Sequence, residues 1–293
     1  MLSETITSAQ NPKIKRLIAL QQKSSERRES GLFVVEGRRE LEHCIDSGYR
    51  IDTIFISESE GTDWLSSAKL PLRSIPPTAS GSGSLPFTKP RAATVLPEDS
   101  QPVQIFCVSD AIMEKIAYRG STEGVIAEVR SRALRLEDLK LKENPLIVVL
   151  ESVEKPGNLG AVLRSADAAG ADAVIICDPL TDLYNPNLIR ASIGAIFTVP
   201  CVACSSEEAI AFFKSRGIKI LTAQLQDSSL YYDYSMTEGT AIVMGTESTG
   251  LTDVWRKAAD AHIRIPMLGQ LDSLNVSVSA AILLFEAVRQ RPL

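Results

Sequence analysis

The feature that most constrains the fold is the stretch 263–291, in which a polar loop joins a short apolar strand to a helix. The loop, residues 269–275, carries Asp272, Ser273 and Asn275 at the point where the helix begins. The first N–H groups of a helix have no partner within it and point outward, so such a loop can hold a polar ligand. Taken alone, Ser273 is more typical of an ordinary helix N-cap.

Alternating strands and helices fill the second half of the chain. The run 146–153 is apolar along its length, which is typical of a parallel strand buried on both faces of a sheet. A helix is predicted from Leu159 to Ala169, and Ser205 with Glu208 forms a capping box for another. Further strands are expected at 173–178, 218–224, 240–245 and 262–267, and a last helix at 274–289. This order predicts an α/β domain with a mostly parallel sheet, whose ligand-binding loops follow the carboxyl ends of the strands.

The first half of the chain predicts a smaller α/β domain. Asn11 and Pro12 are a favourable N-cap and first helical residue. A second helix is expected at 38–47, with strands at 32–37, 51–57, 104–109 and 124–129. The segment 74–102 holds six prolines and an SGSGS run, which disfavour regular structure, so we expect a long surface loop. The chain is therefore divided into a first domain at 1–130, a linker at 131–144 and a second domain at 145–293.

The charge is unevenly distributed. The net charge is −5, yet residues 11–39 carry eight Lys or Arg against three Glu. A local basic patch is sufficient to contact RNA phosphates, although a solvated helix face is an equally simple explanation. The residues that we expect to bind RNA are Lys13, Lys15, Arg16, Arg27, Arg28, Arg38 and Arg39.

The five scattered cysteines argue for a reducing compartment, and we expect the protein in the cytoplasm. Cys201 and Cys204 form one CxxC, but a structural zinc site needs four ligands and no second pair is near. We therefore expect no metal. No signal peptide or membrane-spanning run is recognisable, so we expect no membrane partner.

Two glycine-containing loops precede the C-terminal stretch. Residues 155–164 follow a strand and contain GxxG, whereas a dinucleotide-binding fingerprint requires GxGxxG. Residues 244–251 follow another strand and hold Glu247 between glycines, without the GxxxxGK[ST] of a P-loop. Each loop alone could be an ordinary turn. The interpretation of these loops as a functional site therefore rests on their combination in one α/β domain.

Together these segments resemble the three motifs of the SpoU (TrmH-like) branch of the SPOUT RNA methyltransferases. The matching residues are Asn158-x-Gly160-x-x-x-Arg164, Gly245-x-Glu247-x-x-Gly250-Leu251, and Ile265-Pro266-Met267 followed by Ser273-Leu274-Asn275-Val276-Ser277. The resemblance covers roughly residues 146–291. The segment 33–45 is more loosely similar to the L30e-like substrate-binding domain that many members carry.

The resemblance implies an S-adenosylmethionine-dependent enzyme that methylates a ribose 2′-hydroxyl of structured RNA, ribosomal RNA more than transfer RNA. It implies a SPOUT α/β domain with a deep trefoil knot, a rare exception to unknotted topology, and a small L30e-like α/β domain before it. It also implies a homodimer formed through the SPOUT domain.

The resemblance assigns roles to residues by position. The reacting site would be formed by Asn158, Arg164, Glu247, Ser273 and Asn275. The cofactor would be held by Thr222, Ala223, Gly245, Thr246, Gly250, Ile265, Met267, Leu274 and Asn275. Because a guanidinium stays charged at neutral pH, we expect Arg164 to stabilise the developing alkoxide and hold an RNA phosphate, not to act as a base.

Two other classes of protein stay open. An RNA-binding protein of this fold that no longer catalyses would bind the cofactor without transferring its methyl group. A nicotinamide-dependent dehydrogenase lacks the glycine fingerprint here, and would retain NAD on purification.

Overall fold

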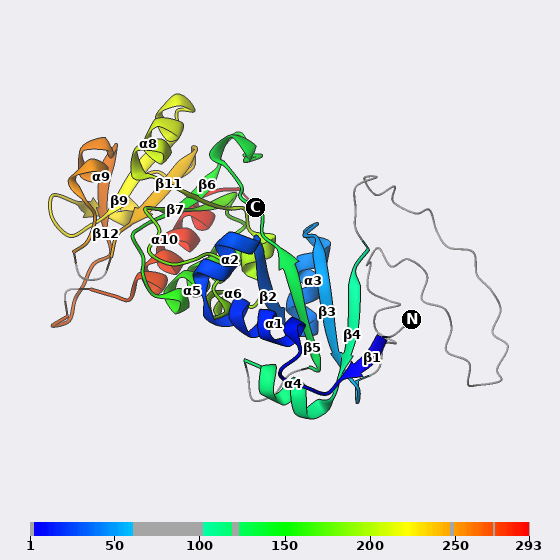
Figure 1. The fold of residues 1–293 in the computed structure, drawn as a ribbon. Helices are drawn as coiled ribbons and strands as arrows, with labels where there is room; N and C mark the ends of the chain where they lie inside the picture. Colours follow the sequence, from blue (N-terminus) through cyan, green and yellow to red (C-terminus); the bar gives the residue numbers. More distant parts are fainter. Residues whose placement is uncertain (1–2, 61–101, 119–122, 247–248, 272, 293) are drawn as a thin grey trace. The chain divides into compact units, whose positions relative to one another are not determined.

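The computed structural model describes residues 3–60, 102–118, 123–246, 249–271 and 273–292, and Figure 1 shows its elements. The chain divides into two compact units, residues 1–130 and 131–293, and each is described by itself. The segment 74–101, Glu247 and Asp272 lie outside the described residues, so the expectations for them stay predictions.

The first unit contains a five-stranded sheet in the order β1-β4-β3-β5-β2. Strand β5 is antiparallel to both β2 and β3, and β4 is parallel to both β1 and β3. The strands are β1 (Ser3–Ile6), β2 (Leu32–Glu36), β3 (Ile51–Ser57), β4 (Gln104–Val108) and β5 (Val125–Arg130). The helices are α1 (Pro12–Gln22), α2 (Ser24–Ser30), α3 (Arg38–Asp46) and α4 (Asp110–Ile116).

The predicted start of α1 is confirmed. The side chain of Asn11 accepts a hydrogen bond from the backbone N–H of Lys13 at 2.9 Å, and Pro12 is the first helical residue. Ile14, Leu17 and Leu20 then lie on the buried face of α1 and pack into the core beside the sheet. A local cap and an apolar stripe are therefore sufficient to define this helix.

The second unit contains a seven-stranded sheet in the order β10-β12-β9-β11-β6-β7-β8. All six pairs of neighbouring strands are parallel. The strands are β6 (Leu146–Glu151), β7 (Ala173–Cys177), β8 (Cys201–Cys204), β9 (Lys219–Ala223), β10 (Ser229–Leu230), β11 (Thr240–Met244) and β12 (Ala261–Arg264). The predicted parallel α/β sheet is confirmed.

Helices cover both faces of this sheet (Figure 1). On one face, α8 and α9 bury Phe213 and Trp255 against Ile147 and Val149 of β6. On the other face, α5 packs on α6, α7 and α10. The helices are α5 (Pro156–Ala168), α6 (Pro186–Ser192), α7 (Ala195–Thr198), α8 (Ser206–Ser215), α9 (Asp253–Ala258) and α10 (Val276–Gln290); two short 3₁₀ turns are η2 (Leu136–Asp138) and η3 (Tyr231–Asp233). Among the described residues, no helix combines the length and the hydropathy that crossing a membrane requires.

Two predicted helix boundaries differ from the structure. Helix α5 begins at Pro156, three residues before the predicted Leu159, because proline is tolerated in the first turn of a helix. Helix α10 begins at Val276, with Asn275 as its N-cap, and not at Leu274.

The CxxC lies on strand β8, which the sequence analysis did not predict. Side chains three positions apart on a strand point to opposite faces, so Cys201 and Cys204 cannot share one metal ion. Within the described parts of the chain there is no cluster of three metal-ligating side chains. Cys204 instead pairs in register with Cys177 of the neighbouring strand.

Arg291 fastens the end of α10 to the rest of the second unit. Its Nε donates to the carbonyl of Met236 at 2.8 Å, and its Nη1 donates to the carbonyl of Asn144 at 2.8 Å. Its Nη2 donates to the carbonyls of Pro145 at 3.3 Å and Glu238 at 2.7 Å. One guanidinium thus satisfies four backbone carbonyls from two separate loops.

We expect Arg291→Ala to lower the free energy of unfolding by about 2–4 kcal/mol, because several carbonyls lose a charged donor at once. Urea unfolding followed by tryptophan fluorescence measures the change. Arg289→Ala is the control: Arg289 is 67% exposed and, among the described residues, forms its ion pair with Glu286, one turn away, so its loss should change the stability much less. An equal loss in both variants would contradict the special role of Arg291.

Candidate active site

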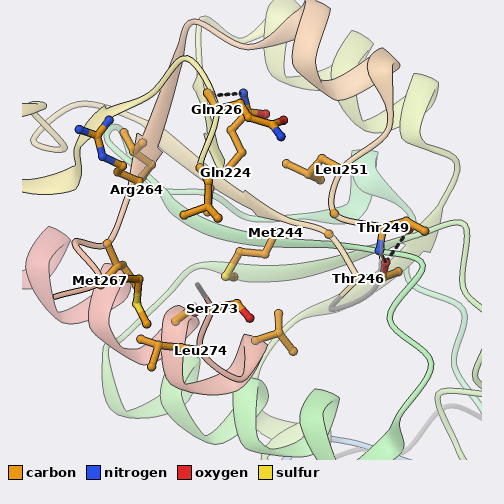
Figure 2. Close-up of a pocket in the computed structure, with 18 of the residues that line it drawn as sticks. Gln224, Gln226, Met244, Thr246, Thr249, Leu251, Arg264, Met267, Ser273 and Leu274 are labelled. Atoms are coloured by element: carbon orange, nitrogen blue, oxygen red, sulfur yellow. Dashed lines mark hydrogen bonds between the residues drawn. The ribbon is translucent and has the colours of Figure 1, made fainter. Parts of the chain in front are cut away.

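A cavity of about 380 Å³ opens at the carboxyl ends of β9, β11 and β12 and beside the start of α10 (Figure 2). Its apolar walls include Leu251, Ile263, Ile265 and Leu274. The volume falls in the range of small-molecule sites, and the position is where parallel sheets bind ligands. The remaining lining residues are Ala223, Gln224, Leu225, Gln226, Met244, Gly245, Thr246, Thr249, Gly250, Arg256, Arg264, Met267, Ser273, Val276 and Ser279.

The loop after β11 closes back on itself at two glycines. An isolated antiparallel bridge pairs Thr246 with Gly250, and the N–H of Gly250 donates to the carbonyl of Thr246 at 3.0 Å. A Cβ atom placed on Gly245 would lie 2.2 Å from the carbonyl oxygen of Gly250. Gly250 has a φ of +67°, which L side chains rarely adopt. Glycine is therefore required at both ends of this wall of the cavity.

Two polar side chains that line the cavity carry buried atoms without a hydrogen-bond partner among the described residues: Gln224 Oε1 and Arg256 Nε. The Nε2 of Gln224 donates to the carbonyl of Gln226 at 2.9 Å, which orients the amide. Buried polar atoms usually have hydrogen-bond partners. Two such atoms without partners in a cavity therefore indicate that a bound ligand supplies the missing partners. Neither residue was predicted from the sequence; the available signal was that Gln224 follows a strand at its carboxyl end.

Most residues predicted to hold the cofactor line the cavity. These are Ala223, Gly245, Thr246, Gly250, Ile265, Met267 and Leu274. Thr222 does not belong to the lining among the described residues: it is buried, and its Oγ1 lies 2.6 Å from Nδ1 of His262. Because consecutive strand side chains point to opposite faces, Thr222 and Ala223 cannot both face the cavity.

The first and third motifs meet at a pair of asparagines. The Nδ2 of Asn275 donates to the Oδ1 of Asn158 at 3.1 Å. Asn158 is the third residue of α5, and Asn275 caps α10. Ser273, predicted for the reacting site, lines the cavity. The structure thus brings together three of the five predicted reacting-site residues.

Arg164 lies further along α5. It is exposed, and it follows Asn158 by about 1.7 turns at 3.6 residues per turn. Within the described part of the chain its guanidinium has no hydrogen-bond or ion-pair partner, and it does not line the cavity. A long cation of this kind is available to a ligand larger than the one the cavity encloses.

Gly160 has a structural role in α5. A Cβ atom there would lie 2.5 Å from the Cβ of Ala191 and 2.8 Å from the backbone nitrogen of Ser192. This close approach joins α5 to α6, so the second glycine of the GxxG serves helix packing and not ligand contact.

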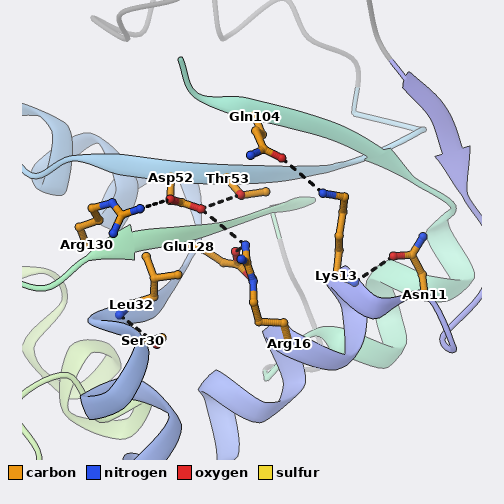
Figure 3. Close-up of polar contacts among 10 residues, drawn as sticks. All are labelled: Asn11, Lys13, Arg16, Ser30, Leu32, Asp52, Thr53, Gln104, Glu128 and Arg130. Carbon is orange, nitrogen blue, oxygen red and sulfur yellow. Dashed lines mark hydrogen bonds and ion pairs between the residues drawn. The ribbon is translucent and has the colours of Figure 1, made fainter. Parts of the chain in front are cut away.

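Four of the seven residues expected to bind RNA have partners within the first unit, and three of these are arginines. Arg27 is buried, and its Nη1 donates to the carbonyl of Leu20 at 2.6 Å, which satisfies the end of α1. Arg16 pairs with the buried Glu128 and lies 3.5 Å from Asp52, while Arg38 pairs with Glu60 (the contacts of Arg16 are in Figure 3). For Arg27 in particular the predicted phosphate contact is wrong, because its guanidinium is enclosed.

Burial raises the pKa of the Glu128 carboxyl above its ordinary value, and the hydrogen bond from Arg16 opposes that shift. Arg16 is therefore needed within the unit to stabilise the charge of Glu128. Lys13 is also engaged, because its Nζ lies 4.2 Å from the centre of the Phe106 ring and 3.3 Å from Gln104 Oε1. The expected RNA-binding residues that remain exposed are Lys15, Arg28 and Arg39.

Comparisons with known proteins match both units. Residues 145–285 match the family model of the SpoU rRNA methylases, and residues 11–127 match that of the MRM3-like substrate-binding domain. The 23S rRNA (uridine(2479)-2′-O)-methyltransferase of Streptomyces viridochromogenes is 28% identical over 97% of this chain and 92% of that protein. The 23S rRNA (guanosine-2′-O-)-methyltransferase RlmB of Vibrio vulnificus is 38% identical over 60% of this chain and 73% of that protein.

Two solved structures are similar to this chain over 98% of its length. A crystal structure of an RNA 2′-O ribose methyltransferase has a TM-score of 0.75 and 34% identity, over 98% of this chain and 99% of that chain. An AdoMet-bound rRNA methyltransferase from Sinorhizobium meliloti has a TM-score of 0.80 and 26% identity, over 98% and 97% of the two chains. The second and third motifs line one cavity, the first motif is bonded to the third, and the sequence and fold are similar to those of known family members; the chain belongs to the SpoU rRNA methylase family.

Proposed function

We propose that this protein transfers the methyl group of S-adenosylmethionine to a ribose 2′-hydroxyl of ribosomal RNA. The observation that carries the proposal is the cavity between the second and third motifs, with the Asn158–Asn275 pair linking the first motif to the third. The relatives named above are 23S rRNA 2′-O-methyltransferases, which favours ribosomal over transfer RNA.

The cavity fits a cofactor that has apolar and polar parts. Leu251, Ile265 and Leu274 offer an apolar surface for a flat heterocycle, and Gln224 Oε1 is an acceptor that no described residue engages. The described lining contains two cations, Arg256 and Arg264, which suit the carboxylate of an amino acid. When bound, the cofactor supplies an electrophilic methyl group on a sulfonium.

The chain's own residues would align and stabilise the ribose hydroxyl. A hydroxyl is a weak nucleophile, so it must be held in line with the methyl group while negative charge develops on its oxygen. In our proposal Asn158 and Asn275 orient the nucleotide by hydrogen bonds. Arg164 supplies the charge that stabilises the developing alkoxide and holds the neighbouring phosphate. Glu247 and Ser273 complete the reacting site in this proposal.

The test is methylation of ribosomal RNA that lacks ribose methyl groups. The protein and tritiated S-adenosylmethionine are incubated with 23S rRNA transcribed in vitro and, in parallel, with transfer RNA. We expect label in the ribosomal RNA, at a nucleotide whose 2′-O-methyl group resists alkaline cleavage. Cofactor binding without label in either RNA would favour the inactive RNA-binding protein.

In this proposal the first unit, residues 1–130, contacts the RNA backbone. Within the second unit, residues 145–293 form the domain that carries the reaction, and residues 131–144 are the linker that joins this domain to the first unit. We expect the triple alanine variant of Lys15, Arg28 and Arg39 to bind RNA more weakly. It should also reduce the slope of log affinity against log salt by roughly 2–3, because each lost phosphate contact removes about 0.7–0.9. Filter binding across a salt series measures both effects.

The matched control removes three exposed charges from the second unit, at Lys214, Arg216 and Lys219. It should leave the salt slope unchanged. Cofactor affinity should not change in either variant, since none of the six residues lines the cavity. An unchanged slope in the first variant would mean that those charges only solvate a helix face.

We also propose that the protein works as a homodimer through α10. One face of this helix is buried at Ala280, Leu283 and Leu284, yet Val278 and Phe285 on another face are 46% and 49% exposed. An exposed apolar stripe on a helix that already packs a core is typical of an interface, and a second copy is the partner we propose. Sedimentation velocity measures the mass. The trefoil knot stays a prediction of the resemblance.

A further inference from the structure

We infer that Ser277, which has no role in the reaction described so far, is a positioning residue for the asparagine pair. Its backbone N–H donates to the Oδ1 of Asn275 at 2.9 Å, and its hydroxyl donates to the same oxygen at 2.6 Å. The Nδ2 of Asn275 donates in turn to the Oδ1 of Asn158 at 3.1 Å. The inference rests on the proposed function, because it concerns how the reacting site is held.

The amide of Asn275 needs an external constraint. The terminal torsion of an asparagine is broad and roughly two-fold, so the oxygen and the nitrogen can exchange places at small cost. Asn275 is exposed, and water competes for both ends of its amide. If the amide turned over, two carbonyl oxygens would face each other across the pair, and the bond that joins α5 to α10 would be lost.

Ser277 supplies the constraint in two ways. A backbone N–H can only donate, so the amide atom that faces it must be the oxygen. The hydroxyl adds a second donor to the same atom, and an oxygen that accepts two hydrogen bonds is held more firmly than one that accepts a single bond. The nitrogen of Asn275 is therefore directed toward Asn158. The oxygen of Asn158 is the acceptor of this bond.

The test compares Ser277→Ala with Ser277→Thr. The alanine variant keeps the backbone donor and loses the hydroxyl. We therefore expect kcat to fall roughly 3- to 10-fold, which corresponds to the free energy that one hydrogen bond contributes. The dissociation constant of S-adenosylmethionine, measured by calorimetry, and the KM for RNA should stay unchanged. The threonine variant restores a hydroxyl and should restore kcat.

Ser215→Ala is the matched control, because its hydroxyl also bonds within a helix, to the carbonyl of Phe212 at 2.8 Å, far along the sequence from the asparagine pair. It should leave kcat unchanged. If Ser277→Ala lowers the melting temperature and leaves kcat intact, the hydroxyl serves only the start of the helix and the inference is overturned.

A double-mutant cycle with Asn158→Ala gives the decisive outcome. If Ser277 acts through the asparagine pair, Ser277→Ala should cost little further kcat once Asn158 is gone. Equal losses in both backgrounds would overturn the inference. A wild-type protein that methylates no RNA contradicts the proposed function instead. In that case the positioning is tested by urea unfolding of the wild type, Ser277→Ala, Asn158→Ala and the double variant. Coupling between the stability effects of the two substitutions supports the inference, and additive effects overturn it.

Discussion

Replacing Arg164 with alanine should lower the rate of methyl transfer by roughly 10²–10³-fold, which is the typical cost of removing one group that stabilises developing negative charge. The cofactor's dissociation constant should not change, because Arg164 does not line the cavity among the described residues. Single-turnover methylation of ribosomal RNA and calorimetry with S-adenosylmethionine measure the two quantities.

Arg164→Lys separates charge from shape. A lysine keeps the positive charge but cannot form the paired hydrogen bonds of a guanidinium, so we expect it to be nearly as slow as the alanine variant. Arg164 is exposed, so neither variant should alter the melting temperature appreciably. Near-normal methylation by Arg164→Ala on the true substrate would remove this residue from the mechanism.

The second large effect is expected from Gly245→Ala. The added Cβ atom would lie 2.2 Å from a backbone oxygen and 2.6 Å from a backbone nitrogen, and neither can move without opening the loop. Overpacking against fixed atoms typically costs about 1–3 kcal/mol. Because this loop forms one wall of the cavity, we expect cofactor affinity to fall on the order of 10- to 100-fold.

Gly157→Ala is the control for that experiment. A Cβ atom on Gly157 meets no atom of the described residues within 4 Å, and alanine is favoured over glycine inside a helix. Calorimetry should therefore give unchanged cofactor affinity for Gly157→Ala, and the stability should not decrease. If Gly245→Ala binds the cofactor as tightly as Gly157→Ala does, the closed loop is not part of the binding site.

The features predicted from the sequence are those set by short-range physics. Asn11 caps α1 because its side chain reaches a backbone N–H two residues away, and Ser205 with Glu208 forms the predicted capping box for α8. The run 146–153 is apolar along its length, which predicted a buried parallel strand. In the structure β6 is buried throughout, because helices cover both faces of the sheet. The residues that line the cavity were predicted from the family resemblance. The resemblance assigns their positions in the sequence but gives no distances or contacts.

What could not be predicted depends on partners far along the chain. Arg16 and Glu128 are 112 residues apart, so nothing local in the sequence indicates that the arginine is held within the unit. The same is true of Asn158 and Asn275, which are 117 residues apart. Strand β8 was missed because four residues with a CxxC spacing carry almost no period-two pattern.

The parallel pairing of the second sheet has a consequence for how fast the protein reaches its native state. Thr240 of β11 pairs with Leu146 of β6, so the central pair of strands joins residues separated by most of the unit. The entropy of closing such a long loop is lost before the pairing compensates for it, which slows folding. The cavity exists only after β9, β11 and β12 have joined, so S-adenosylmethionine cannot act as a template for the sheet. By binding the finished state it should slow unfolding and leave the refolding rate unchanged.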